Sequence, residues 1–309
     1  MTPFMLQFHK KLRIICSVER EKIKQRGSGF GISIVYLFFR IFGYKGLHFI
    51  LFFVVLYYTL TTPKIKSYLK EYYLLVTGKF NFFIYYRHIY TFALVFADRI
   101  FSKQFLSRYT IDTYNSHVIN LDKGLILLFS HVGDWSMCGL VPSKKKVRIN
   151  MVMYEAIKES IKKFSQTIQD KNLPQLNVID LHEGSMSVAI KVAKALQEKE
   201  IVGMMADRYL SKQSAQEVEF FGKKVFINGN PFEVAYNRDI PLTALFSLRK
   251  GDYRYASYYH NLSPFDRSLS KEESIAKVAQ EYMYLLEGVI KDHPDQWFNH
   301  YDFFETQSS

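Results

Sequence analysis

Residues 125–139 read LILLFSHVGDWSMCG, and they join a buried strand to a group of reactive side chains. Five apolar residues, a run typical of a strand buried on both faces, lead directly into Ser130 and His131. Gly133 then permits a sharp turn, and Asp134 is placed to begin the next helix. Because ligands gather at the carboxyl ends of parallel strands, this stretch predicts an imidazole at the functional edge of an α/β sheet, with a carboxylate nearby.

Short apolar runs alternate with helical stretches from residue 116 onward. This alternation predicts an α/β fold with a largely parallel sheet that has helices on both faces. We expect strands at VINL (118–121), LILLF (125–129), KVRINMVMY (146–154), LNVID (176–180), IVGMMA (201–206), PLTALFSL (241–248) and YRYASYYH (253–260), and helices at 155–170, 185–200 and 271–291.

The first third of the chain has the composition of a membrane-associating region. Residues 1–29 carry seven basic groups, and residues 30–62 then contain only two charged side chains, Arg40 and Lys45. The uncharged run 46–62 just reaches the length that a spanning helix needs. It could span once with the basic leader in the cytoplasm, form an interfacial hairpin with residues 30–43, or be a buried helix of a soluble protein.

Residues 64–110 continue with the spacing of amphipathic helices, whose apolar stripe faces either a core or lipid, and for each aromatic stripe we expect an ordinary core. We therefore expect a helical membrane-anchoring region over residues 1–110 and an α/β domain over residues 111–309.

The overall composition limits the classes of function. The chain has 309 residues, 48% of them hydrophobic, 17% aromatic, and a formal charge of +12, which favours an acidic partner such as nucleic acid, anionic lipid or a carrier protein. Cys16 and Cys138 offer neither a disulfide framework nor a zinc cluster. A Gly-rich nucleotide loop and zinc-ligand spacing are both missing from the sequence, so we expect no cofactor. A nucleic-acid-binding protein remains an alternative, although the sequence contains no nucleic-acid recognition motif.

The residues at the strand end suggest acid–base chemistry. A histidine oriented by a carboxylate can deprotonate a hydroxyl so that it attacks a carbonyl carbon. Asp134 could instead be only a helix cap, with His131 a hydrogen-bonded bystander. A second polar pair, Asp207 and Arg208, ends the run IVGMMA, which indicates one shared crevice.

Three parts of the chain together resemble the bacterial lipid A biosynthesis acyltransferases. These are the opening stretch, IVGMMADRYLSKQSAQEVEFFGKKVFINGNPFEVAYNRDIPL (201–242) and HPDQWFNHYDFFE (293–305). The resemblance covers roughly residues 123–304. It implies a glycerol-phosphate-acyltransferase-like fold and a membrane-bound enzyme at the cytoplasmic face of the bacterial inner membrane. It also implies transfer of an acyl chain from acyl carrier protein or coenzyme A to a lipid or glycolipid.

The family pairs a histidine with an acid five residues later, and this chain departs from that pattern. Ser136 holds the acid position, and Asp134 holds a position where the family usually has Asn. Either the carboxylate has moved to Asp134, or His131 works without its usual partner, or catalysis has been lost.

The resemblance and the residues together give a set of expected site residues. We expect His131 as the general base and Asp134 as its orienting acid. Arg208 would neutralise a phosphate of the acceptor or carrier, although a surface ion pair is an equal alternative. Gly229 would form the turn that opens a helix whose N-terminus faces an anion. The expected substrate-binding residues are Asp207, Arg208, Trp135 and Gly229.

Overall fold

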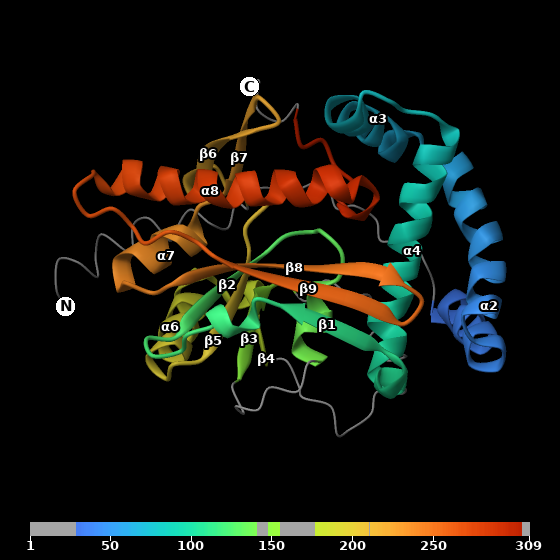
Figure 1. Cartoon of the computed structure of the whole chain (residues 1–309), viewed down its shortest axis with the longest axis horizontal. Coiled ribbons are helices and arrows are strands. Elements are labelled where there is room, and N and C mark those ends of the chain that lie inside the picture. Colours follow the sequence, from blue (N-terminus) through green and yellow to red (C-terminus); the bar gives the residue numbers. More distant parts are fainter. Residues whose placement is uncertain (1–28, 141–147, 155–176, 210, 305–309) are drawn as a thin grey trace.

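The computed structural model describes residues 29–140, 148–154, 177–209 and 211–304 (Figure 1). The basic leader, the expected helix at 155–170 and most of the lysine run around residue 145 lie outside these ranges. The described part has an α/β fold with a group of N-terminal helices beside its sheet, as the sequence predicts.

Three helices form the N-terminal region. Helix α2 (Gly29–Thr61) is kinked at Gly43, whose φ of 60° lies outside helical values. Pro63 then begins α3 (Pro63–Thr77), because a missing N–H costs nothing in the first helical turn. Helix α4 (Phe82–Phe105) begins where the Asn81 side chain accepts a hydrogen bond from the Ile84 backbone N–H. The stretch at 31–61 is long and apolar enough to cross a membrane by length and composition, with 33% of its most apolar window buried.

A seven-stranded sheet forms the centre of the molecule. Its strands are β1 (Thr110–Tyr114), β2 (Leu125–Phe129), β3 (Ile149–Met153), β4 (Asn177–Asp180), β5 (Ile201–Met205), β8 (Leu242–Gly251) and β9 (Arg254–Asn261), in the order β1-β9-β8-β2-β5-β3-β4. All neighbours pair in parallel except β8 with β9. The largely parallel α/β prediction is therefore confirmed.

The two faces of the sheet are covered differently. Alternate strand residues such as Ile126 and Leu128 share one hydrophobic cluster with α6 (Ser185–Gln197), α7 (Asn230–Arg238) and α8 (Lys271–Asp292). Leu125, Leu127 and Phe129 point to the opposite face. Figure 1 shows α8 lying along the sheet above β8.

Two local predictions differ from the structure. The run VINL forms no strand, because a short 3₁₀ turn, η2 (Ser116–Val118), includes its first residue. Val118 and Ile119 pack against the sheet as loop residues. Residues 215–228, for which we expected no strands, form a hairpin of β6 (Ala215–Phe220) and β7 (Lys223–Asn228). Its two turn residues, Phe221 and Gly222, both have positive φ, as a tight hairpin turn requires. The other 3₁₀ turns are η1 (Leu106–Arg108), η3 (Trp135–Leu140), η4 (Leu181–Glu183), η5 (Lys212–Ser214) and η6 (Pro294–Gln296).

A buried carboxylate fastens α4 to the sheet. Asp98 is fully buried and accepts hydrogen bonds from Tyr109 at 3.0 Å, from Tyr255 at 2.8 Å and from Arg249 Nε at 3.0 Å, and it also contacts Tyr44 of α2. Buried carboxylates persist where partners of this kind satisfy them. The N-terminal helices are thus held against the carboxyl edge of the sheet, toward which β8 points in Figure 1.

Candidate active site

The register of the sheet places two distant residues at the same level. In the β2–β5 pair, Phe129 lies opposite Met205, so the residues two positions further on, His131 and Asp207, leave the sheet side by side. The C-terminal segment crosses this edge, because Val132 forms a β-bridge with Trp297. The Phe298 N–H also donates to the His131 carbonyl at 2.8 Å. The predicted gathering of polar groups at the carboxyl edge is therefore present.

Asp207 is the carboxylate that contacts His131. Its Oδ1 lies 2.9 Å from the ring Nδ1, and its Oδ2 accepts from the backbone N–H of His131 at 2.9 Å. Trp297 Nε1 donates to the same Oδ2 at 3.2 Å. Asp207 is fully buried, whereas the His131 side chain keeps 29% of its surface exposed. The ring Nε2 has no hydrogen-bond partner among the residues that the structure describes.

The predicted contact between Asp134 and His131 is not the one found. Asp134 is fully buried, and its Oδ1 accepts from Arg99 Nε at 2.9 Å and from the Ser136 hydroxyl at 2.7 Å. The cause is the turn at Gly133, which has a φ of 57° and sends the following Asp134 N–H to the Ser247 carbonyl of β8. Asp134 therefore points into the body of the fold, and the prediction that it orients the imidazole is wrong.

Burial and charge set the ionisation of this pair. Burial lowers the pKa of His131, and the nearby Arg208 lowers it further, which together outweigh the effect of Asp207. Burial alone would raise the pKa of Asp207, but the contacts with His131 and Arg208 bring it to about 2. At neutral pH the pair is consequently a carboxylate next to a neutral imidazole, which can accept a proton.

The other expected site residues have definite places. Arg208 donates from Nη2 to the Phe298 carbonyl at 2.9 Å, and its guanidinium lies 4.7 Å from the Tyr301 ring centre. Trp135 packs against Phe129 and lies under Arg99.

Gly229 caps the N-terminus of α7, and its N–H donates to the Ser214 carbonyl at 2.7 Å. It opens a helix, as predicted. Within the described residues, no contact joins it to His131.

Two residues that matter here were not predicted individually. Trp297 belongs to the quoted HPDQW motif, which was the available signal, but nothing in the sequence says that its indole reaches Asp207. Arg99 comes from α4, within the region that we assigned to anchoring alone. An arginine on an aromatic helix gives no sequence signal of a partner 35 residues away.

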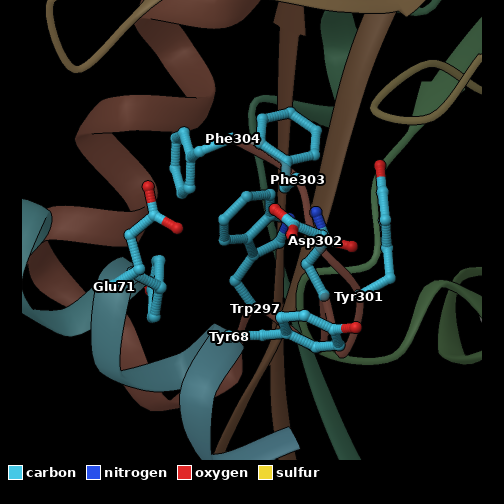
Figure 2. A pocket seen from close by; sticks show the side chains of 9 residues that line it. Tyr68, Glu71, Trp297, Tyr301, Asp302, Phe303 and Phe304 are labelled. Carbon is cyan, nitrogen blue, oxygen red and sulfur yellow. The ribbon is translucent and has the colours of Figure 1, made fainter. Parts of the chain in front are cut away.

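The cavities described lie beside the site or far from it. One, shown in Figure 2, lies between α3 and the C-terminal segment; Trp297 forms one wall, and there is room for about one water molecule. Asn299 also lines it, and both polar atoms of its side chain are buried without a partner in the described structure. The second is open, about 370 Å³, and lies near Lys199 and Arg238 at the amino ends of the strands. No group of three potential metal ligands occurs among the described residues.

Comparisons with known proteins relate this chain to a protein family and to individual proteins. The family described as bacterial lipid A biosynthesis acyltransferase matches residues 93–301. UvrABC system protein C of Bdellovibrio bacteriovorus is 33% identical over 124 residues, which make up 39% of this chain and 19% of that protein. The chain thus spans about a fifth of the length of this curated relative. The crystal structure of the 1-acyl-sn-glycerophosphate acyltransferase PlsC from Thermotoga maritima is 13% identical, with 75% of this chain and 98% of that chain covered and a TM-score of 0.35.

Proposed function

This chain belongs to the bacterial lipid A biosynthesis acyltransferase family, and we propose that it moves a fatty acyl chain from an acyl thioester to a hydroxyl of a lipid or glycolipid. The thioester is that of acyl carrier protein or coenzyme A. His131 acts as the general base, and the reaction takes place at the cytoplasmic face of the bacterial inner membrane. No nucleic-acid partner and no cofactor enter this proposal.

One observation carries the proposal: a neutral imidazole stands at the carboxyl edge of a parallel sheet, and its Nε2 has no hydrogen-bond partner in the part of the chain that the structure describes. A general base must hold a lone pair at working pH and must be reachable by the proton that it abstracts. The lowered pKa of His131 supplies the first condition, and the exposed part of its ring supplies the second.

The reaction then follows from this geometry. The His131 Nε2 takes the proton of the acceptor hydroxyl, and the hydroxyl oxygen attacks the carbonyl carbon of the thioester. The tetrahedral intermediate collapses, the C–S bond breaks, and the imidazolium returns its proton to the departing thiolate. Acceptor and thioester meet in one ternary complex, so no acyl group is attached to the enzyme.

Two residues support substrate binding in this proposal. Arg208 lies directly after Asp207 and brings a permanent positive charge to the site, which suits a phosphate of the acceptor or carrier. The Trp135 ring flanks the same loop as His131 and offers an apolar surface to the substrate.

The outer surface of α2 supports a location at the membrane. Its exposed side chains are strongly apolar and include Phe42, Phe49, Phe52, Phe53 and Leu60, each at least half exposed. A soluble monomer rarely exposes a continuous aromatic surface of this kind. Since α2 and α4 stand at the carboxyl edge of the sheet in Figure 1, the same region would bring amphiphilic acceptors close to His131.

A second candidate function is a catalytically silent membrane scaffold, because Ser136 replaces the acid of the family pattern. The two candidates differ in the effect of Ser136→Glu. An enzyme whose imidazole already has a carboxylate gains nothing from it, whereas a silent protein would rise from negligible to substantial activity.

The test of the proposed function uses purified full-length protein in detergent. Palmitoyl-acyl carrier protein and palmitoyl-coenzyme A serve as donors, and a bacterial membrane lipid extract serves as the acceptor mixture. Mass spectrometry should detect acylated lipid with the native protein. With His131→Gln the rate of acyl transfer should be ~10²–10⁴-fold lower.

The matched control is His182→Gln, which alters an exposed histidine that also pairs with an aspartate, Asp180, at 2.8 Å. It should leave the rate unchanged. Full activity of a folded His131→Gln protein would refute the proposed mechanism.

A further inference from the structure

Asp134 and Asp207 both lie at the carboxyl edge of the sheet near His131, and of these two only Asp207 contacts the imidazole. Asp134 follows His131 closely in the sequence, whereas Asp207 comes from the end of β5. Both are fully buried. The question is which carboxylate holds the imidazole in its reactive orientation.

We propose that Asp207 is the residue that positions His131 for catalysis, and that Asp134 instead joins the catalytic loop to α4 through Arg99. This inference rests on the proposed function, since it names the acid that serves the same general base. The two aspartates thus have separate tasks, although the sequence alone suggests Asp134 for the first of them.

Asp207 holds His131 at two points. One carboxylate oxygen faces the ring Nδ1 at 2.9 Å, and the other accepts from the backbone N–H of the same residue at 2.9 Å. A single side chain therefore fixes both the ring and the backbone to which the ring is attached. Such two-point attachment leaves the imidazole little rotational freedom, and holding a catalytic group in this way contributes to catalysis.

The same contact selects the tautomer. The carboxylate of Asp207 can only accept hydrogen bonds, because its pKa of about 2 keeps it ionised at neutral pH. Nδ1 of His131 must therefore carry the proton and donate it, and the lone pair of a neutral ring is then on Nε2. This is the tautomer that general-base catalysis at Nε2 requires.

Asp207 is itself held in place. Trp297 Nε1 donates to Oδ2 at 3.2 Å, so each carboxylate oxygen has a defined donor. Trp297 is 1% exposed and packs against Phe220 and Phe303, so the indole cannot turn away. The C-terminal HPDQW segment thereby supports the acid rather than the substrate.

Asp134 has partners that exclude it from this role. Its Oδ1 receives Arg99 Nε, the Ser136 N–H and the Ser136 hydroxyl, while its Oδ2 is buried without a partner in the described structure. The backbone N–H of Asp134 is bound to the Ser247 carbonyl of β8. Arg99 belongs to α4, so this ion pair ties an N-terminal helix to the loop that carries His131.

The first test observes the native protein and needs no substrate. In full-length protein labelled with ¹⁵N-histidine, the ¹⁵N chemical shifts of His131, assigned by comparison with His131→Gln, report the tautomer at pH 7.5. We expect Nδ1 protonated and Nε2 bare. A ring protonated on Nε2 would overturn the inference, whatever the enzymatic activity.

The second test compares two isosteric changes, Asp207→Asn and Asp134→Asn. Asp207→Asn should lower kcat by up to ~10⁴-fold, because an amide can impose the wrong tautomer, and it should change the ¹⁵N shifts of His131. Asp134→Asn should leave the His131 shifts unchanged and kcat within about tenfold. It should lower the melting temperature, because it weakens the Arg99 pair.

The outcomes separate this inference from the proposed function. If His131→Gln abolishes acyl transfer while Asp134→Asn lowers kcat as much as Asp207→Asn and shifts the His131 signals, only the assignment of the acid is wrong. If folded His131→Gln keeps full activity, the general-base role of His131 in the proposed function fails, and the tautomer measurement still decides the contact. Should Asp207→Asn not fold, Trp297→Phe removes only one donor to the acid and should lower kcat by about tenfold.

Discussion

Asp207 Oδ1 lies 2.9 Å from His131 Nδ1, although 76 residues separate the two in the sequence. Parallel pairing of β2 with β5 creates this contact, because equivalent positions beyond the ends of the two strands lie side by side. The result is a fully buried acid beside a ring that keeps 29% of its side-chain surface exposed.

The pH profile of acyl transfer should follow the ionisation of His131. Burial and Arg208 lower the pKa of this ring from its ordinary value near 6.5, so the reactive neutral form persists below that pH. We expect the rising limb of kcat/KM to have its midpoint below pH 6.5. Arg208→Gln removes one lowering influence and should move that midpoint to higher pH. A shift to lower pH in Arg208→Gln would contradict this account of the site.

Acid should destabilise the protein through two buried histidines. Burial lowers the pKa of His88 to about 3, and burial with the charge of neighbouring groups lowers the pKa of His300; the two rings face each other with Nε2 atoms 3.2 Å apart. Because the unfolded chain titrates near 6.5, it binds more protons than the folded chain at lower pH. The contribution of these two histidines to the free energy of unfolding is therefore fully present above pH 6.5. Below that pH the free energy of unfolding falls by about 1.4 kcal/mol per pH unit for each histidine that stays neutral in the folded chain.

Chemical denaturation in detergent between pH 7.5 and 4.5 measures this slope. His88→Gln should flatten it by about the contribution of one histidine. His182→Gln, at an exposed ring, is the control and should leave it unchanged. An equal slope in native protein and His88→Gln would show that His88 is not held neutral.

Gly133→Ala should disrupt the loop that carries His131. Gly133 has a φ of 57°, and a Cβ atom there would lie 1.9 Å from the Ser247 carbonyl oxygen. The β8 backbone cannot move that far without breaking its pairing, so we expect loss of folded protein or of acyl transfer. Gly288→Ala, inside α8 with open space around the added carbon, should raise stability by about 0.5–1 kcal/mol. Thermal unfolding of both variants provides the comparison.

Membrane binding should depend on the outer face of α2. Phe49 and Phe53 are 60% and 53% exposed, and each apolar side chain transferred from water stabilises binding by about 1.5–3 kcal/mol. Replacing both with Ser should lower partitioning into vesicles of bacterial lipid by at least ~10²-fold. Tyr284→Ser alters an exposed aromatic residue on α8 and should have no effect. Unchanged partitioning of the Phe49/Phe53 double variant would place the membrane contact elsewhere.

The fold followed from local patterns where those patterns were strong. The five apolar residues of β2 and the alternation of strands with helices were sufficient to predict a parallel α/β sheet. The predicted strand at VINL is wrong because a short apolar run is equally compatible with a buried loop. Here Asn115 adopts a left-handed conformation that starts a 3₁₀ turn. The hairpin of β6 and β7 was missed although its Phe221–Gly222 turn lies within the FFGK motif.

The proposed boundary at residue 110 stays a prediction, and α4 bears on it. This helix belongs by position to the N-terminal region, yet Asp98 and Arg99 bind groups of the sheet and of the loop that carries His131. Composition indicated apolar, aromatic helices there but not their polar contacts, because a few buried charges leave periodicity unchanged.

The sequence by itself determined which groups could do chemistry and at which edge of the sheet they would stand, since side-chain type and strand periodicity are local properties. Only the tertiary structure decided how those groups are paired. The backbone turn at Gly133 directs Asp134 into the fold toward Arg99, and the register of two strands brings Asp207 to the imidazole. Hydrogen bonds act over about 3 Å in space, and separation along the chain does not reveal which atoms come that close.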